Sequence, residues 1–315
     1  MLSPPHSSRQ ITDMTDIQTI LVAGRSGQVA RALAATPLPA AVKLVALGRP
    51  DLDLLDPNSI TRAMDRVLPD LVINAAAYTA VDQAETDDAN AFALNADGAA
   101  HLAKAAAERG APILHLSTDY VFDGSKSGPY VETDPVAPLG VYGASKLAGE
   151  KAVAAANPDH FILRTAWVYS AVGKNFVKTM LRLADTRDEV GVVADQVGNP
   201  TSAADIAWAL IAMAQRIRSG PAAYVPGVYH MTATGDASWA DFAEAIFAAS
   251  AALGGPSANV NRIGSSEFPA PVKRPGNSRL DCGRLSAAFG VTLPDWQGST
   301  LACVTELVET KGWNS

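Results

Sequence analysis

Short apolar runs alternate with longer amphipathic segments along the first half of the chain. The runs are four or five residues long, and in the longer segments the apolar positions recur at helical spacing. The expected strands are residues 20–23, 44–47, 71–74, 113–117 and 161–165, and the expected helices are 28–35, 59–68, 95–109 and 143–156. Wholly apolar strands separated by helices indicate a parallel sheet that is covered on both faces. We therefore predict an α/β fold built on a doubly wound, parallel Rossmann-type sheet.

The alternation weakens after about Val168. Turn-rich pieces such as 195–201 then mix with helical patterns such as 238–253. This change predicts two domains, which are a dinucleotide-binding domain over 17–168 and a smaller α/β C-terminal region, 169–315, that is mainly a substrate-binding domain. A strand pattern at 228–231 indicates that the chain returns to the main sheet, so we expect it to cross between the domains more than once.

Composition narrows the class of protein. Of 315 residues, 48% are hydrophobic and 18% charged, and the net charge of −7 comes without any basic run that would follow a phosphate backbone. Nucleic acid is therefore not an expected partner. No apolar stretch reaches the ~18 residues of a membrane span, so no membrane association is expected either.

The start of the chain and its cysteines bear on its location. Residues 1–16 are rich in Ser, Pro and Thr and lack the order of a secretory signal, which predicts a disordered N-terminal extension. Cys282 and Cys303 are far from any CxxC spacing, so we expect two reduced thiols. Together these features favour a cytoplasmic protein.

A glycine-rich turn follows the first expected strand. Its sequence, Gly24-Arg-Ser-Gly27-Gln-Val-Ala30, places glycines where backbone can approach a pyrophosphate at the start of a helix. A tight strand-to-helix turn needs glycine for structural reasons as well, so the spacing alone does not distinguish a cofactor site from a structural turn. Its place in a βαβ unit favours a dinucleotide site, whose expected contacts are Gly24, Ser26, Gly27, Gln28 and Val29.

The end of the second expected strand bears on the choice of cofactor. An acid that would take the ribose hydroxyl of NAD is missing there, and Arg49 follows Gly48 instead. Arg49 is suited to a 2′-phosphate, which favours NADPH over NADH, although a solvated loop arginine is the alternative. Asp53 and Leu54 are expected next to the adenine.

Tyr142 and Lys146 form the candidate catalytic pair. Their spacing of four residues places phenol and ammonium on one face of the helix. A tyrosine can protonate a carbonyl oxygen as hydride arrives at carbon, and the lysine is expected to lower the phenol pKa and to bind the nicotinamide ribose. Thr118 ends a buried strand and is expected to donate to the same carbonyl, although β-branched residues also end strands for reasons of propensity.

Longer motifs carry a resemblance to a known family. They lie at 24–29, 74–82, 117–122, 141–150, 164–169, 175–181, 195–201 and 274–278, and the run from Ser117 to Glu150 discriminates best. On these motifs the chain resembles the dTDP-4-dehydrorhamnose reductases, which are extended short-chain dehydrogenases/reductases. The resemblance implies NADPH or NADH as cofactor and a dTDP-sugar as substrate. It also implies reduction of the C4 ketone of dTDP-4-dehydro-6-deoxy-L-mannose by a monomer or homodimer.

The resemblance also assigns site residues. It implies that the cofactor is flanked by Ala75, Ala76, Ala77 and Tyr78, and that Tyr142 and Lys146 contact it too. Thr118, Tyr120 and Trp167 would border the sugar, and Asn175, Gln196 and Arg274 would lie toward the nucleotide diphosphate.

Two other functions are compatible with these motifs, and the resemblance also raises the question of a metal site. The same chemistry on another sugar would make the chain a different nucleotide-sugar reductase or epimerase. A non-catalytic subunit of the methionine adenosyltransferase regulatory type is the second alternative, but intact Thr118, Tyr142 and Lys146 favour an enzyme. Some relatives hold magnesium through acidic residues at a dimer contact. Glu189 and Glu306 are present here, but Ala32 in the first helix stands where another acid would be, so we predict no metal.

Overall fold

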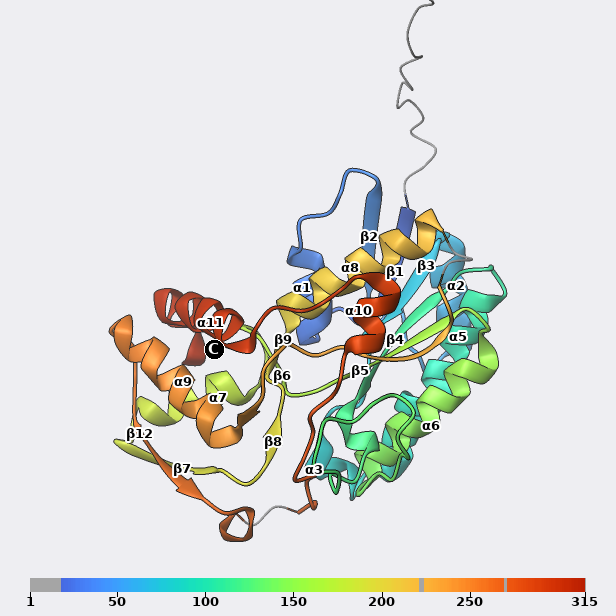
Figure 1. The fold of residues 1–315 in the computed structure, drawn as a ribbon. Coiled ribbons are helices and arrows are strands. Elements are labelled where there is room, and N and C mark those ends of the chain that lie inside the picture. The colour runs from blue at the N-terminus through green and yellow to red at the C-terminus, as the bar shows by residue number, and fades with distance from the viewer. Residues whose placement is uncertain (1–17, 221–223, 269–270, 315) are drawn as a thin grey trace, which may run out of the picture.

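The computed structural model describes residues 18–220, 224–268 and 271–314. The extension predicted for residues 1–16 lies outside the described residues. The chain forms a larger lobe around one twisted sheet and a smaller lobe that contains α7, α9 and α11 (Figure 1).

The main sheet has six parallel strands and confirms the predicted doubly wound architecture. Its strands are β1 (Gln18–Ala23), β2 (Val42–Leu47), β3 (Leu71–Asn74), β4 (Ile113–Thr118), β5 (His160–Thr165) and β10 (Gly227–His230). They lie in the order β10-β5-β4-β3-β1-β2. The chain reverses its direction of winding between β1 and β3, where Ala23 pairs with Asn74. Ligands of such sheets bind outside the carboxyl ends of the strands at this point.

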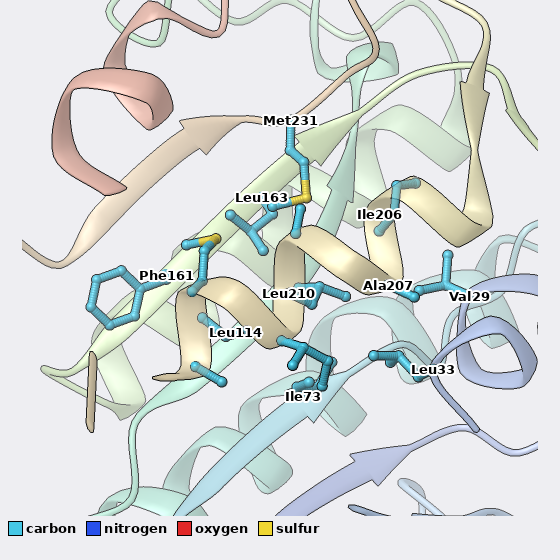
Figure 2. Packing of buried hydrophobic residues seen from close by; sticks show 14 of the residues in the cluster. Val29, Leu33, Ile73, Leu114, Phe161, Leu163, Ile206, Ala207, Leu210 and Met231 are labelled. Atoms are coloured by element: carbon cyan, nitrogen blue, oxygen red, sulfur yellow. The ribbon is translucent and has the colours of Figure 1, made fainter. Parts of the chain in front are cut away.

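Helices cover both faces of this sheet. One face carries α2 (Pro57–Val67), α5 (Ala99–Ala107) and α6 (Val141–Ala156), and the other carries α1 (Gln28–Ala35), α8 (Ala203–Ser219) and α10 (Gly283–Phe289). Successive strand residues serve opposite faces: Ile20 and Val22 pack with α1 and α8, whereas Leu21 and Ala23 pack under α2 and α5. Figure 2 shows Leu210 of α8 among Ile73 and Leu114 of the sheet.

Short segments connect these elements. They include α3 (Val81–Ala84), α4 (Asp88–Phe92), the π-helix η1 (Ala93–Gly98) and the 3₁₀ turn η2 (Asp119–Val121). The helix expected over 95–109 is therefore a π segment that leads into α5. Gly98, the last residue of that segment, packs closely on the chain after β2, since a Cβ there would lie 2.9 Å from the Leu54 Cβ.

The smaller lobe has its own apolar core. Strands β7 (Glu189–Val193) and β12 (Asn259–Ile263) pair in parallel, and α7 (Phe176–Ala184), α9 (Trp239–Ala252) and α11 (Trp296–Thr310) pack around them. The other short elements are β6 (Val168–Tyr169), β8 (Val197–Gly198), β9 (Thr201–Ser202), β11 (Ala237–Ser238), η4 (Ser265–Glu267) and η5 (Gly312–Asn314). In the part of the chain that the structure describes, no helix has the length and apolar character to cross a membrane.

Candidate active site

The glycine turn lies against the end of β3. Gly24 has φ of +112°, and a Cβ there would be 3.2 Å from the backbone of both Ala75 and Ala76. Only glycine fits this backbone and this approach. The α1 helix that follows has no side-chain cap and no acid in its first turn, so its first N–H groups are available to an anion. Ser26 and Val29 belong to the same turn, which therefore has the shape of a pyrophosphate cradle.

The segment 75–78 lies beside that cradle, as the cofactor prediction requires. The Asn74 side chain accepts from the Ala76 N–H at 3.2 Å, and Asn95 accepts from the Tyr78 N–H at 2.8 Å. The Tyr78 hydroxyl donates to Asp87 at 2.9 Å. Ala75, Ala77 and their neighbours are half-buried. The backbone of this segment is thus held in place while one side stays accessible.

Arginines gather at the end of β2. Arg49 is exposed, and its carbonyl accepts from the Arg25 guanidinium at 3.3 Å. A single acid, Asp51, lies between Arg25 at 3.7 Å and Arg66 at 3.6 Å. Sequence reasoning found only Arg49, because Arg25 and Arg66 come from other elements. This edge suits an anionic group on the adenosine ribose.

Asp53 and Leu54 follow this edge. The Asp53 carboxylate accepts from the Leu55 N–H at 3.0 Å, and its carbonyl accepts from the Ser59 hydroxyl at 2.9 Å. Leu54 is only 3% exposed and belongs to the core under α2 and α5. The adenine contact of both residues stays a prediction, and Leu54 already has a structural role.

Thr118, Tyr142 and Lys146 come together at the carboxyl end of β4. Thr118 is the last residue of that strand, and Tyr142 and Lys146 lie in the first turns of α6. The Thr118 hydroxyl lies close enough to the Tyr142 phenol to act against the rise of the phenol pKa. Gly143 allows this approach, because a Cβ there would lie 2.2 Å from the Tyr120 carbonyl oxygen. The Tyr120 ring meets the Tyr142 ring edge-on at 5.6 Å.

The electrostatics of this group differ from the sequence-based expectation. Burial lowers the pKa of Lys146 to about 8, and its ammonium donates to the Leu116 carbonyl at 2.7 Å. Burial raises the pKa of the Tyr142 phenol, and nearby Asp119 and Tyr120 raise it further. The expectation that Lys146 lowers the Tyr142 pKa was therefore wrong for this structure, since the ammonium faces β4 and desolvation dominates. In this state Tyr142 is held in its protonated form.

A cleft of about 950 Å³ has no lining residue from the group Thr118, Tyr142 and Lys146. Arg274 in its wall is near enough to Tyr120, which contacts Tyr142, to act on the Tyr120 pKa. The lining of the cleft includes Asn175, Gln196 and Arg274, the three residues expected toward the nucleotide end of the substrate. Lys273, Trp239 and Phe176 also line it and were not predicted. With two adjacent cations and an aromatic wall, the cleft suits a ligand with an anionic and an apolar part.

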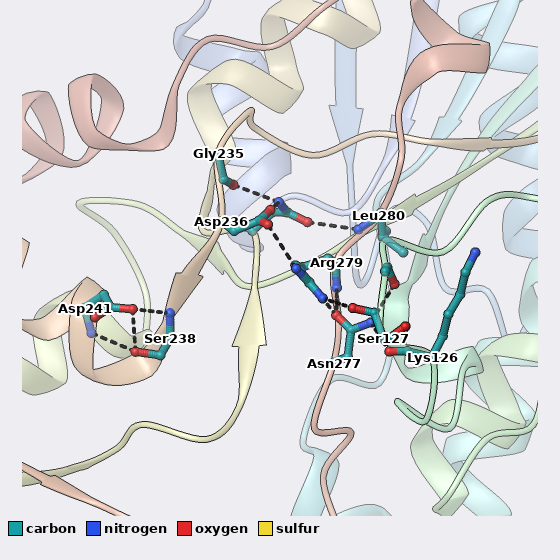
Figure 3. A network of polar contacts seen from close by, with 11 residues as sticks. Lys126, Ser127, Gly235, Asp236, Ser238, Asp241, Asn277, Arg279 and Leu280 are labelled. Atoms are coloured by element: carbon teal, nitrogen blue, oxygen red, sulfur yellow. Dashed lines mark hydrogen bonds and ion pairs between the residues drawn. The ribbon is translucent and has the colours of Figure 1, made fainter.

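Arg274 bridges two distant parts of the chain in this cleft. Its guanidinium lies 3.2 Å from Asp82, which lies in the first turn of α3 in the other lobe. The segment that carries Arg274 is anchored at Asn277, which donates to the Lys126 and Gly128 carbonyls at 2.7 and 2.8 Å. Figure 3 shows Arg279 extending this network to Ser127 and Asp236. The position of Arg274 is therefore fixed by the fold.

Trp167 lies in an aromatic stack. Its ring is parallel to that of Trp239 at 3.5 Å, and Phe176 lies 4.6 Å from Trp239 on the cleft wall. Trp167 has φ of +48°, and Gly198 is required beside it because a Cβ would lie 2.6 Å from the indole. One face of Trp167 is thus covered by a residue that sequence reasoning missed. Local sequence carries no signal for this pairing.

Asn175 and Gln28 connect the two lobes. The Asn175 side chain caps α7 by accepting from the Lys178 N–H at 3.1 Å, and its amide donates to the side-chain oxygen Oε1 of Gln28 at 2.9 Å. Ser170 donates to the same Gln28 oxygen at 2.9 Å. Gln28 opens α1, directly after the glycine turn. The predicted cofactor residue and the predicted substrate residue are therefore in direct contact.

The three positions considered for a metal lie on separate elements. Glu189 begins β7, Glu306 lies on α11 and Ala32 lies on α1. Among residues 18–220, 224–268 and 271–314, no three His, Cys, Asp or Glu side chains are grouped so that they could hold a metal ion.

The fold and this arrangement of hydroxyl, phenol and ammonium beside a dinucleotide cradle define a nicotinamide-dependent oxidoreductase of the Rossmann type. The family model for the RmlD substrate binding domain matches residues 18–309. The chain belongs to this family, the dTDP-4-dehydrorhamnose reductases.

Relatives of known name support that assignment. The chain is 50% identical to a dTDP-4-dehydrorhamnose reductase of Sinorhizobium fredii, over 92% of this chain and 97% of the relative. It is 46% identical to one of Burkholderia thailandensis, over 92% and 99%. A crystal structure of the Bacillus anthracis reductase in complex with NADP superposes with a TM-score of 0.84 at 34% identity, covering 92% of this chain and 99% of that one.

Proposed function

We propose that the chain reduces the C4 ketone of dTDP-4-dehydrorhamnose to give dTDP-L-rhamnose, with NADPH as the reductant. The observation that carries the proposal is the grouping of Thr118 and Tyr142 at the carboxyl edge of β4, which Tyr120 connects to Arg274 in the wall of the cleft. Relatives that match over nine tenths of the chain carry the name of this reductase.

The residues present fit a nicotinamide dinucleotide. The approach of Gly24 to Ala75 and Ala76 leaves a cradle that any Cβ would fill, and the uncapped α1 N-terminus faces it. When bound, NADPH supplies the hydride that reduces the ketone carbon. Arg49 and Arg25 would hold a 2′-phosphate, and the reductase of Bacillus anthracis was crystallised with NADP.

The catalytic group has distinct roles in this proposal. Tyr142 donates its phenolic proton to the ketone oxygen, and burial keeps that proton in place until the substrate arrives. Thr118 donates a hydrogen bond to the same oxygen and orients it. Lys146 binds the nicotinamide ribose and, as a cation, stabilises the phenolate that remains.

The substrate spans the cleft from this edge outward. Tyr120 and Trp167 border the deoxysugar, whose methyl group and ring C–H faces are apolar. Arg274 and Lys273 face the diphosphate, with Asn175 and Gln196 beside it. The ion pair between Arg274 and Asp82 is half-exposed, so a diphosphate can compete for the guanidinium.

The same proposal places the protein in the cytoplasm, where NADPH is maintained and where Cys282 and Cys303 stay as free thiols. A monomer or a homodimer would serve, because the described catalytic group and cleft come from one chain.

The test is an assay with purified chain, NADPH and dTDP-4-dehydrorhamnose. Loss of the NADPH absorbance together with dTDP-L-rhamnose, identified by proton coupling at C4, is the expected result. A product with the opposite C4 configuration would assign a different reductase. Tight NADPH binding without turnover of this or any other 4-keto nucleotide sugar would favour a regulatory subunit.

A further inference from the structure

Asp119 is a buried carboxylate in direct contact with Thr118. It is 2% exposed and follows Thr118 in the chain. Its Oδ1 accepts a hydrogen bond from the Thr118 hydroxyl at 3.0 Å. Its Oδ2 is buried and has no hydrogen-bond partner among the described residues. Neither the fold nor the mechanism above gives this carboxyl group a role.

The hydroxyl of Thr118 has one proton and two acceptor positions. The Tyr120 N–H donates to Oγ1 at 3.2 Å, which fills one acceptor position, and the Tyr142 phenol lies near enough for the hydroxyl to lower the phenol pKa. The single proton points to Asp119. While Asp119 is ionised, Thr118 therefore has no proton left to donate to a ketone oxygen.

The surroundings of Asp119 favour its neutral form. Burial raises the pKa of this carboxyl group to about 6. Four groups oppose the rise: the Ser278 hydroxyl from the segment that carries Arg274, the Thr118 hydroxyl on β4, and the backbone N–H groups of Asp119 and Tyr120. Ser278 makes no hydrogen bond of good geometry to Oδ2. Tyr120 and Tyr142 face it from η2 and α6 as neutral phenols.

We propose that Asp119 is a positioning residue whose carboxylic acid form makes Thr118 a donor toward the substrate. The Asp119 O–H then donates to Thr118 Oγ1, and the Thr118 proton turns to the ketone oxygen. No bond is broken in this step, since each proton stays on its own oxygen. The inference rests on the role proposed for Thr118 in ketone reduction.

This arrangement gives activity a specific dependence on pH. The acid form of Asp119 is lost as pH rises through its pKa, so kcat/KM should fall by about tenfold for each pH unit above about 6. Substrate binding removes more water and holds the proton to higher pH, so kcat should fall later than kcat/KM.

Asp119→Asn tests the proposal directly. The amide N–H₂ donates to Thr118 at every pH, so kcat/KM at pH 8 should match or exceed that of the unaltered enzyme, and the decline above pH 6 should disappear. Asp119→Leu is the control of similar size without a donor, and it should lose at least tenfold at all pH values. NADPH titration shows that each variant is folded.

Thr118→Val provides a second test that does not depend on altering Asp119. The decline above pH 6 should be absent in Thr118→Val, and adding Asp119→Asn to it should change nothing further. The proposal would be overturned if the decline persisted in Thr118→Val. It would also be overturned if Asp119→Asn kept the unaltered pH profile, or if it were as impaired as Asp119→Leu. Absence of turnover by the unaltered enzyme would instead overturn the proposed function.

Discussion

Arg164 on β5 donates two hydrogen bonds to the carboxylate of Glu150 on α6, at 2.9 and 2.7 Å. Both side chains are almost fully buried, with 5% and 4% exposure. The Ser117 hydroxyl, one residue before Thr118, donates to the same carboxylate at 2.6 Å. Glu150 lies one helical turn after Lys146 on α6. The pair therefore fastens the helix that carries the catalytic group to two strands of the sheet.

Removing one partner of this pair should destabilise the protein strongly. In Glu150→Ala the buried Arg164 guanidinium is left without its counter-charge, at a cost of roughly 3–5 kcal/mol. Urea unfolding should show a lower midpoint. Glu108→Ala is the matched control, because Glu108 pairs with Lys104 at 4.0 Å where the side chains are 66% and 72% exposed. Equal stability of the two variants would show that Glu150 contributes no more than a surface acid.

Tyr142→Phe should lower kcat by at least ~10²-fold and leave NADPH affinity nearly unchanged, because proton donation is a transition-state role. Steady-state kinetics and a fluorescence titration of NADPH measure the two quantities. Near-normal turnover would remove Tyr142 as the acid. Tyr130→Phe, in a buried tyrosine outside the catalytic group, should leave kcat within a few fold.

Lys146→Ala should weaken NADPH binding as well as turnover, since its contact with ribose exists in the ground state. Burial lowers the pKa of Lys146 to about 8, so the unaltered enzyme should bind NADPH less tightly as pH rises through that value. The lowered pKa also means that protonated Lys146 reduces the free energy of unfolding, with its full effect below about pH 8. This destabilisation disappears as pH rises from about 8 to ~10.5, where the unfolded chain loses the proton as well. Lys151→Ala is the control, because Lys151 is exposed on α6, and it should keep the pH dependence of NADPH binding. If Lys146→Ala also kept this pH dependence, Lys146 would not be the group that binds the ribose.

Arg49→Ala should raise KM for NADPH and leave KM for NADH almost unchanged, if the guanidinium meets a 2′-phosphate. A charge-assisted contact of this kind contributes roughly 1.5–3 kcal/mol, or about ten- to a hundredfold in KM. Arg25→Ala should have the same selectivity, because the Arg25 guanidinium contacts the Arg49 carbonyl. Equal effects on both cofactors would indicate a packing role for these arginines.

Treatment with EDTA should neither lower activity nor change molecular size. Glu189 and Glu306 lie on separate elements and Ala32 offers no carboxylate, so tightly held Mg²⁺ would lack ligands. Activity and sedimentation measured before chelation, after it, and after added Mg²⁺ give the answer. A loss of either property that Mg²⁺ reverses would show that the ion is part of the protein.

The main sheet could be predicted because its central strands β1, β3, β4 and β5 are almost fully buried and therefore read as mainly apolar runs. The same reasoning located Thr118, since a hydroxyl at the end of such a strand reaches the edge where ligands bind. The spacing of Tyr142 and Lys146 on one helix is likewise a local property.

Contacts between distant segments could not be predicted in this way. The stack of Trp167 on Trp239, the ion pair of Arg274 with Asp82 and the bond between Gln28 and Asn175 depend on how the lobes pack. The raised pKa of the Tyr142 phenol has the same origin, because desolvation is set by neighbours that a local spacing does not show.

Strand β10 forms one edge of the main sheet by pairing with β5. In the chain, β10 comes after α7 and β7, which belong to the smaller lobe. Helices α8 and α10 likewise pack on the main sheet. A fragment that ends near Val168 would leave β5 with an open edge and α1 without its partner α8. Sugar specificity in such a chain cannot be exchanged by joining the C-terminal half of one protein to the N-terminal half of another. New specificities have to arise by substitutions within the lobes, at positions such as Trp239 and Gln196 that face the cleft.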